Sequence, residues 1–109
     1  MRTQINLRPD ELRLVRSILA AHVPGYEVRV FGSRITGNAK PASDLDLCVV
    51  DVPPLSAGTV RRLQTSFSDS TLPFKVDLSC WSNLNEEFRR LVDASSVLLE
   101  DTSAEVRAA

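Results

Sequence analysis

Apolar residues recur along this chain with two different periods, and the change from one period to the other outlines a mixed domain. Spacing of three or four residues, which is typical of an amphipathic helix, occurs in three segments: 10–23, 55–67 and 86–94. Runs of strand-forming residues occur in three others: 26–31, 45–50 and 74–81. A short apolar run at 97–99 predicts a further edge strand. This order predicts an α/β (α+β) domain, in which helices pack on one small sheet.

Turn and capping residues mark the ends of these segments. Pro24–Gly25 ends the first helix, Pro53–Pro54 ends the second strand, and residues 38–43 form a loop. Candidate N-caps of the two later helices are Ser56 or Thr59 and Asn83 or Asn85. The apolar stripe of the last helix comprises Phe88, Leu91 and Val92.

Composition and charge narrow the range of functions. The 109 residues are 43% hydrophobic and 25% charged, as in an ordinary globular domain. A chain of this length holds one core, so any further substrate-binding domain would be very small or would come from another protein. The 13 Lys and Arg residues against 14 Asp and Glu residues give a net charge of −1. This balance argues against nucleic-acid binding, which depends on neutralising a backbone of phosphates.

The sequence shows neither a membrane span nor a disulfide framework. It has no run of about 18 apolar residues, and its N-terminus lacks the apolar stretch of a secretory signal, so we expect a cytoplasmic protein without membrane contact. Cys48 and Cys80 lie in apolar runs without the paired spacing of a zinc knuckle. We expect both to be reduced core residues.

The first candidate for chemistry is the glycine-containing turn Gly32–Gly37, directly after a predicted strand. Glycine and a hydroxyl at a strand end allow backbone N–H groups to approach an anion closely, and a short helix starting there would add its dipole. Taken alone, such a turn is more often only a turn.

The second candidate is the pair Asp44 and Asp46. Residues two apart in a strand share a face, so these carboxylates would stand side by side while Leu45 and Leu47 enter the core. Adjacent carboxylates repel each other, and a divalent cation would relieve the repulsion. Hard oxygen ligands suit Mg²⁺ or Mn²⁺. The alternative is a solvated strand end.

The third candidate is Asp77, which interrupts an apolar run. An unpaired carboxylate in a strand interior is costly, so it needs a partner. One possibility is an ion pair with Lys75 on the same face or with Arg29 across the sheet. If its strand neighbours the second strand, Asp77 instead joins Asp44 and Asp46 in a cluster able to hold two metal ions.

Together these motifs resemble the signature of the nucleotidyltransferase superfamily with the DNA polymerase β-like fold. The residues that carry the resemblance are Phe31–Arg34, Gly37, Ser43–Leu47 and Val76–Leu78. Within the superfamily the chain is most similar to the minimal nucleotidyltransferase (MNT) domains, which are commonly paired with HEPN-type partners as toxin–antitoxin modules. The resemblance implies a palm-like mixed sheet flanked by helices, with the domain over residues 1–100 and a polar tail over 101–109.

The resemblance also implies roles for the glycine-containing turn. Gly32 and Ser33 would hold the β- and γ-phosphates of ATP through backbone N–H groups and the serine hydroxyl. Many MNT domains have a basic residue where this chain has Thr36, so Arg34 would have to serve alone as the phosphate-facing cation.

For the acidic residues the resemblance implies a two-metal site. Asp44 and Asp46 would ligate two Mg²⁺ ions, with Mn²⁺ as a possible substitute. Asp77 would ligate the catalytic ion and orient, or help deprotonate, the attacking hydroxyl. That hydroxyl would attack the α-phosphate of ATP and release pyrophosphate.

Three functions follow from the resemblance. The first is an antitoxin enzyme that transfers AMP from ATP to a hydroxyl of a HEPN-type toxin, which suits a chain too short to build its own acceptor pocket. The second is transfer to a small molecule such as an aminoglycoside. The third is a non-catalytic antitoxin that masks its partner by binding, which the presence of Asp44, Asp46 and Asp77 disfavours.

Overall fold

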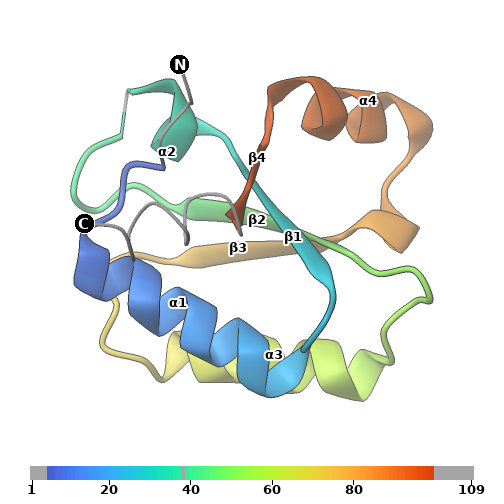
Figure 1. Ribbon diagram of the computed structural model, residues 1–109, viewed down its shortest axis with the longest axis horizontal. Helices are drawn as coiled ribbons and strands as arrows, with labels where there is room; N and C mark the ends of the chain where they lie inside the picture. The colour runs from blue at the N-terminus through green and yellow to red at the C-terminus, as the bar shows by residue number, and fades with distance from the viewer. Residues whose placement is uncertain (1–4, 38, 100–109) are drawn as a thin grey trace.

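The computed structural model describes residues 5–37 and 39–99. Their elements form the mixed α/β domain that the sequence predicts (Figure 1). In chain order these elements are α1 (Pro9–His22), β1 (Glu27–Phe31), α2 (Ser33–Thr36), β2 (Leu45–Val50), α3 (Ala57–Ser68), β3 (Val76–Cys80), the 3₁₀ helix η1 (Trp81–Asn83), α4 (Glu86–Ser95) and β4 (Val97–Leu98). The predicted tail over 101–109, and with it the domain boundary near residue 100, lies outside the described residues.

The four strands form one mixed sheet in the order β3-β2-β1-β4. β1 is antiparallel to both of its neighbours, whereas β2 and β3 are parallel and connected through α3. The predicted edge strand is confirmed, because Val97 and Leu98 pair with the outer side of β1. This topology places the C-terminal end of β1 beside the N-terminal ends of β2 and β3.

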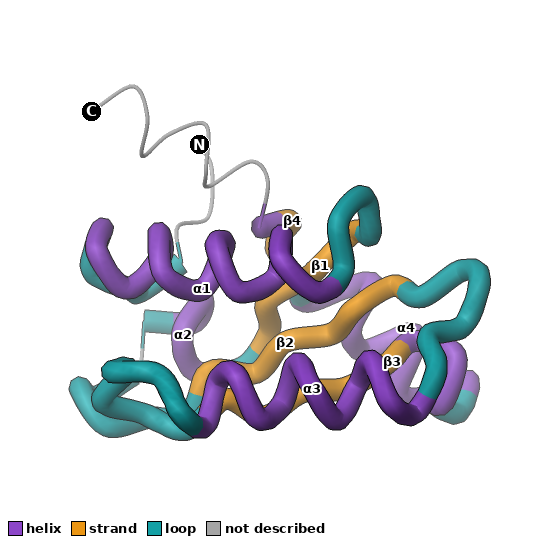
Figure 2. Tube along the Cα trace, turned by 90° about the horizontal axis from the view of Figure 1, so that it is seen from below, coloured by secondary structure: helices purple, strands orange, loops and turns teal. Residues whose placement is uncertain are grey.

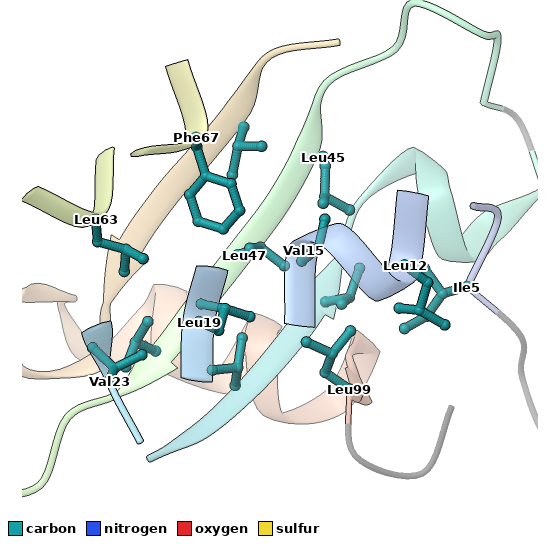
Figure 3. Close-up of a cluster of buried hydrophobic side chains, with 14 of the residues drawn as sticks. Ile5, Leu12, Val15, Leu19, Val23, Leu45, Leu47, Leu63, Phe67 and Leu99 are labelled. Atoms are coloured by element: carbon teal, nitrogen blue, oxygen red, sulfur yellow. The ribbon is translucent and has the colours of Figure 1, made fainter. Parts of the chain in front are cut away.

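The hydrophobic core lies between one face of the sheet and the helices α1 and α3, which run side by side across it (Figures 1 and 2). Alternate strand residues turn toward these helices; Val30, Leu45, Leu47 and Val49 have no solvent-exposed surface. Figure 3 shows Leu45 and Leu47 near side chains from α1 and α3, such as Val15 and Phe67. Each fully buried aliphatic side chain contributes about 1.5–3 kcal/mol, which fixes the register of the central strands.

The opposite face of the sheet is covered only in part, by α2 and α4 (Figure 1). Of the apolar stripe predicted in α4 only Val92 is buried, whereas Phe88 is 37% and Leu91 53% exposed. The Phe88 ring contacts Phe31 edge-on, with 5.9 Å between ring centroids. Polar strand residues on this face, including Asp46 and Asp77, therefore remain within reach of solvent.

Both cysteines are free and buried, as expected of reduced core residues. Burial is the main reason that the pKa of the Cys48 thiol rises to about 11. At neutral pH this thiol stays protonated and is a poor nucleophile. Among the described residues, no helix is both long enough and apolar enough to cross a membrane.

Two of the four candidate caps are used. The hydroxyl of Ser56 accepts from Thr59 N at 3.1 Å, and the side-chain oxygen of Asn85 accepts from Phe88 N at 2.8 Å. The third strand is shorter than predicted, because the chain turns into η1 at Trp81. This turn is held by the buried carboxylate of Asp51, which was not among the predicted functional residues.

Asp51 is 1% exposed and ties the end of β2 to two other segments. Its carboxylate accepts from Ser82 N at 2.8 Å, from the Ser82 hydroxyl at 2.6 Å and from Leu55 N at 3.1 Å. Burial alone would raise the pKa of Asp51, but these hydrogen bonds outweigh it, and the pKa lies below its ordinary value. The folded protein therefore gains stability from ionised Asp51.

Replacing Asp51 by asparagine is expected to lower the free energy of unfolding by about 2 kcal/mol at neutral pH, because hydrogen bonds to a buried charge are lost. A group with a depressed folded pKa stabilises the fold above its unfolded pKa of about 3.9, and this contribution disappears as the pH falls through the folded value. Urea unfolding should therefore show a difference from wild type that shrinks in acid. Asp93→Asn, at an exposed position on α4, is the control; an equal effect of the two changes would contradict the role of Asp51.

Candidate active site at one edge of the sheet

Three segments that are distant in the sequence meet at one edge of the sheet. β1 ends there at Phe31, while antiparallel β2 and parallel β3 begin there. In the resulting register Phe31 lies opposite Asp46, and Asp46 lies opposite Asp77. The strands of Asp46 and Asp77 are neighbours, which is the condition under which Asp77 was expected to join the acidic cluster. Gly32 and Ser33 follow Phe31 directly, so they adjoin the same carboxylates.

Asp46 and Asp77 form a coupled pair of carboxyl groups. Burial raises the pKa of Asp46, and the negative charges of Asp77 and Asp44 and a side-chain hydrogen bond with Asp77 raise it further. A divalent cation between the two carboxylates would offset their mutual repulsion, and both could ligate it.

Within the described part of the chain, no Lys or Arg side chain forms an ion pair with these two carboxylates. Among residues 5–37 and 39–99, neither Lys75 nor Arg29 forms an ion pair with Asp77. Arg29 instead contacts Glu27 at 2.8 Å and the hydroxyl of Ser96 at 2.6 Å. The ion-pair alternative for Asp77 is therefore wrong for the structure described here.

Asp44 lies outside the strand in which it was predicted. It precedes β2 rather than lying within it, and its side chain is exposed. In the described part of the chain no three acidic, histidine or cysteine side chains are close enough to hold one metal ion. The structure therefore brings Asp46 and Asp77 together and leaves Asp44 nearby, where its charge still acts on Asp46.

Gly32 allows the closest approach of backbone to carboxylate in the site. Its φ of +82° and ψ of −157° belong to a region that is essentially restricted to glycine. A Cβ atom at this position would overlap with Oδ2 of Asp46. The absent side chain thus leaves room for Asp46 beside the turn. The helix that follows, α2, has only four residues, so its dipole adds little of the expected anion attraction.

Arg34 does not face the carboxylates, contrary to the role as a phosphate-facing cation that the sequence analysis assigned to it. The residue is 4% exposed. Its guanidinium donates to three backbone oxygens, those of Asn6 at 3.0 Å, Pro41 at 3.1 Å and Ser43 at 2.7 Å. It also lies 4.3 Å from the centre of the Phe74 ring. No local sequence pattern identifies these partners, because they come from segments before, after and far from the turn.

Comparison with known proteins agrees with this geometry. The family model of the nucleotidyltransferase domain matches residues 12–104. The chain is 40% identical over 98 residues to a probable protein adenylyltransferase MntA from Haemophilus influenzae, covering 90% of this chain and 86% of the relative.

Two solved structures share the fold. One is a toxin–antitoxin with AMP-PNP, with a TM-score of 0.69, 19% identity, and coverage of 89% of this chain and 84% of that one. The other is a mutant of the toxin–antitoxin MntA-HpeT, with a TM-score of 0.68, 18% identity, and coverage of 94% and 83%. The match over most of the sequence, together with the acidic pair beside a glycine turn, shows that the chain belongs to the nucleotidyltransferase domain family.

Proposed function

We propose that this protein transfers AMP from ATP to a hydroxyl of a partner protein, and that the partner is a HEPN-type toxin which the modification neutralises. The observation that carries the proposal is the carboxylate pair Asp46 and Asp77 directly beside Gly32. The name of the Haemophilus influenzae relative, a probable protein adenylyltransferase, supports the reaction, and the toxin–antitoxin structures of the same fold support the kind of partner.

The residues at this edge fit divalent cations. Carboxylate oxygens are the ligands that Mg²⁺ prefers. Burial raises the pKa of Asp46, and the nearby charges of Asp77 and Asp44 raise it further, so a cation would stabilise the ionised carboxylate. Asp44, Asp46 and Asp77 are the proposed ligands of two Mg²⁺ ions, or of Mn²⁺, with the exposed Asp44 joining the pair when a cation is present. The ions would neutralise charge on the phosphates and lower the pKa of the attacking hydroxyl.

The chain itself positions the reactants. The backbone at Gly32 and the hydroxyl of Ser33 would hold the β- and γ-phosphates, because this turn directly follows β1 at the edge where the carboxylates lie. Asp77 would orient the acceptor hydroxyl toward the α-phosphate and help remove its proton. A bond then forms between the acceptor oxygen and the α-phosphorus, the bond to the bridging oxygen breaks, and pyrophosphate leaves. Positioning supplies most of the rate enhancement.

The open side of the sheet beside the site suits a protein acceptor. The face that carries Asp46 and Asp77 is covered only in part, by α2 and α4, so a partner could bring its own surface to the site. ATP is abundant in the cytoplasm, which is the compartment we assign to the reaction.

Labelled ATP, Mg²⁺ and the protein encoded by the neighbouring gene provide the test. Label should appear on the partner, as an AMP adduct, with wild type and not with Asp77→Ala. A tight unlabelled complex that is indifferent to Asp77→Ala would overturn transfer and favour masking. Label on an added aminoglycoside and none on the partner would overturn the protein acceptor.

A further inference from the structure

Arg34 connects the two halves of the candidate site. It belongs to α2, directly after Gly32 and Ser33, yet its guanidinium reaches the loop that leads into β2. The bond to Ser43 O, at 2.7 Å, is the shortest of its three bonds to carbonyl oxygens. Ser43 immediately precedes Asp44, so this bond acts on the backbone from which a proposed metal ligand projects.

The guanidinium of Arg34 is fixed through Nη1, Nη2 and its face, whereas its buried Nε has no hydrogen-bond partner in the described part of the chain. Phe74, which leads into β3, lies 4.3 Å from the guanidinium carbon, and Asn6 precedes α1. The loop is also fastened to itself, because Ser43 N donates to Lys40 O at 2.9 Å and Lys40 N donates to the Ser43 hydroxyl at 2.8 Å. Arg34 therefore ties a locally ordered loop to the glycine turn and to the start of β3.

We infer that Arg34 is a positioning residue, which sets the distance between the Gly32–Ser33 turn and Asp44 by holding the carbonyls of Pro41 and Ser43. The expected effect of Arg34 on metal and nucleotide binding rests on the proposed function. Its effect on the order of the loop before Asp44 does not. Arg34 acts through the backbone before Asp44 and makes no contact with the phosphates.

Lysine cannot replace this residue. Two different guanidinium nitrogens serve the three carbonyls, Nη1 for Asn6 and Nη2 for Pro41 and Ser43. A lysine ammonium donates hydrogen bonds from one nitrogen atom only, and it lacks the planar face that stacks on Phe74. A phosphate contact, by contrast, is partly preserved when lysine replaces arginine, because the charge remains.

Arg89 provides a matched control. Like Arg34 it donates to a backbone carbonyl, Trp81 O at 3.0 Å, and lies over an aromatic ring, that of Trp81 at 5.4 Å. It holds the junction between η1 and α4, and not the loop before Asp44. Arg89→Lys therefore removes the same kind of interaction at a different place.

The experiment measures amide hydrogen exchange of residues 39–45 in full-length Arg34→Lys, Arg89→Lys and wild type, without metal. Loss of charge-assisted hydrogen bonds should speed exchange in this segment about tenfold in Arg34→Lys and leave it unchanged in Arg89→Lys. Phe74→Leu, which removes the ring and keeps the carbonyl bonds, should give a smaller increase. It also keeps the test informative if Arg34→Lys does not fold.

The second measurement is Mn²⁺ binding in the presence of a non-hydrolysable ATP analogue. It is monitored through the electron paramagnetic resonance signal of Mn²⁺. The Mn²⁺ concentration for half-saturation should rise about tenfold in Arg34→Lys, in parallel with the loop opening. Unchanged exchange in Arg34→Lys and Phe74→Leu overturns the inference. Faster exchange in Arg34→Lys, together with a wild type that transfers no AMP, supports the positioning role and refutes only the proposed function.

Discussion

Replacing Asp46 by asparagine is expected to abolish AMP transfer and, at the same time, to stabilise the metal-free protein. Asp46 is the proposed metal ligand at the centre of the site, between Gly32, which follows β1, and Asp77 on β3. Loss of a ligand that supplies several kcal/mol of transition-state stabilisation lowers the rate on the order of a thousandfold. Asparagine has nearly the same shape, so the sheet is expected to keep its register.

The gain in stability follows from the sign of the pKa shift. Burial, followed by the charges of Asp77 and Asp44, raises the pKa of Asp46 in the folded protein. Between the unfolded pKa of about 3.9 and this raised value, the folded state binds more protons than the unfolded chain, so stability falls as the pH rises through that window. At neutral pH the ionised carboxylate opposes folding, and asparagine removes this opposition.

Thermal unfolding at several pH values, with and without Mn²⁺ and ATP, measures both effects. Without metal, Asp46→Asn should melt at or above the wild-type temperature at pH 7 and show less loss of stability between pH 4 and 7. With Mn²⁺ and ATP, only wild type should gain stability, since ligand binding to the folded state raises the melting temperature. Asp93→Asn is the control for removal of one negative charge. A metal-free variant that melts well below wild type would refute the electrostatic argument.

The acidic pair could be predicted from the sequence because local rules determine it. A carboxylate is costly inside an apolar strand, so Asp46 and Asp77 each required a compensating partner. The parallel pairing of their strands then brought the two together in register. Asp44 was less predictable, since whether the strand begins before or after this residue depends on the loop that the rest of the fold holds in place.

The hydrogen-bond partners of Arg34 and Asp51 could not be predicted from the sequence. An arginine after a glycine–serine turn suggests an anion ligand, but its carbonyl partners come from residues as far apart as Asn6 and Ser43. In the same way, η1 shortens the third strand because Ser82 bonds to Asp51, which is 31 residues earlier. Hydrogen bonds between distant segments leave no periodic signal in the sequence, whereas core packing does.

Replacing Gly32 by alanine is expected to damage both the fold and the site. The backbone conformation of Gly32 disfavours any side chain, and the added Cβ would overlap with Oδ2 of Asp46. Strain and overlap together should lower the free energy of unfolding by roughly 2–5 kcal/mol. Displacing the Asp46 carboxylate by even about 1 Å should lower the rate of AMP transfer on the order of a hundredfold.

A matched glycine separates these two causes. Gly25 has a φ of +83° and open space around the position of a Cβ, so Gly25→Ala carries conformational strain without overlap. It should lower stability by about 1–2 kcal/mol and leave the rate of AMP transfer unchanged.

A double-mutant cycle measures the overlap directly. Once Asp46 is replaced by alanine, the nearest remaining atom to an added Cβ at Gly32 is the Cβ of residue 46, at 3.5 Å, which is an ordinary contact. In the Asp46→Ala background, Gly32→Ala should therefore cost only its strain. The resulting coupling energy should be about 1–3 kcal/mol in urea unfolding. A coupling energy near zero would mean that Gly32 is required only for the backbone conformation of the turn. The space beside Asp46 would then have no part in positioning its carboxylate.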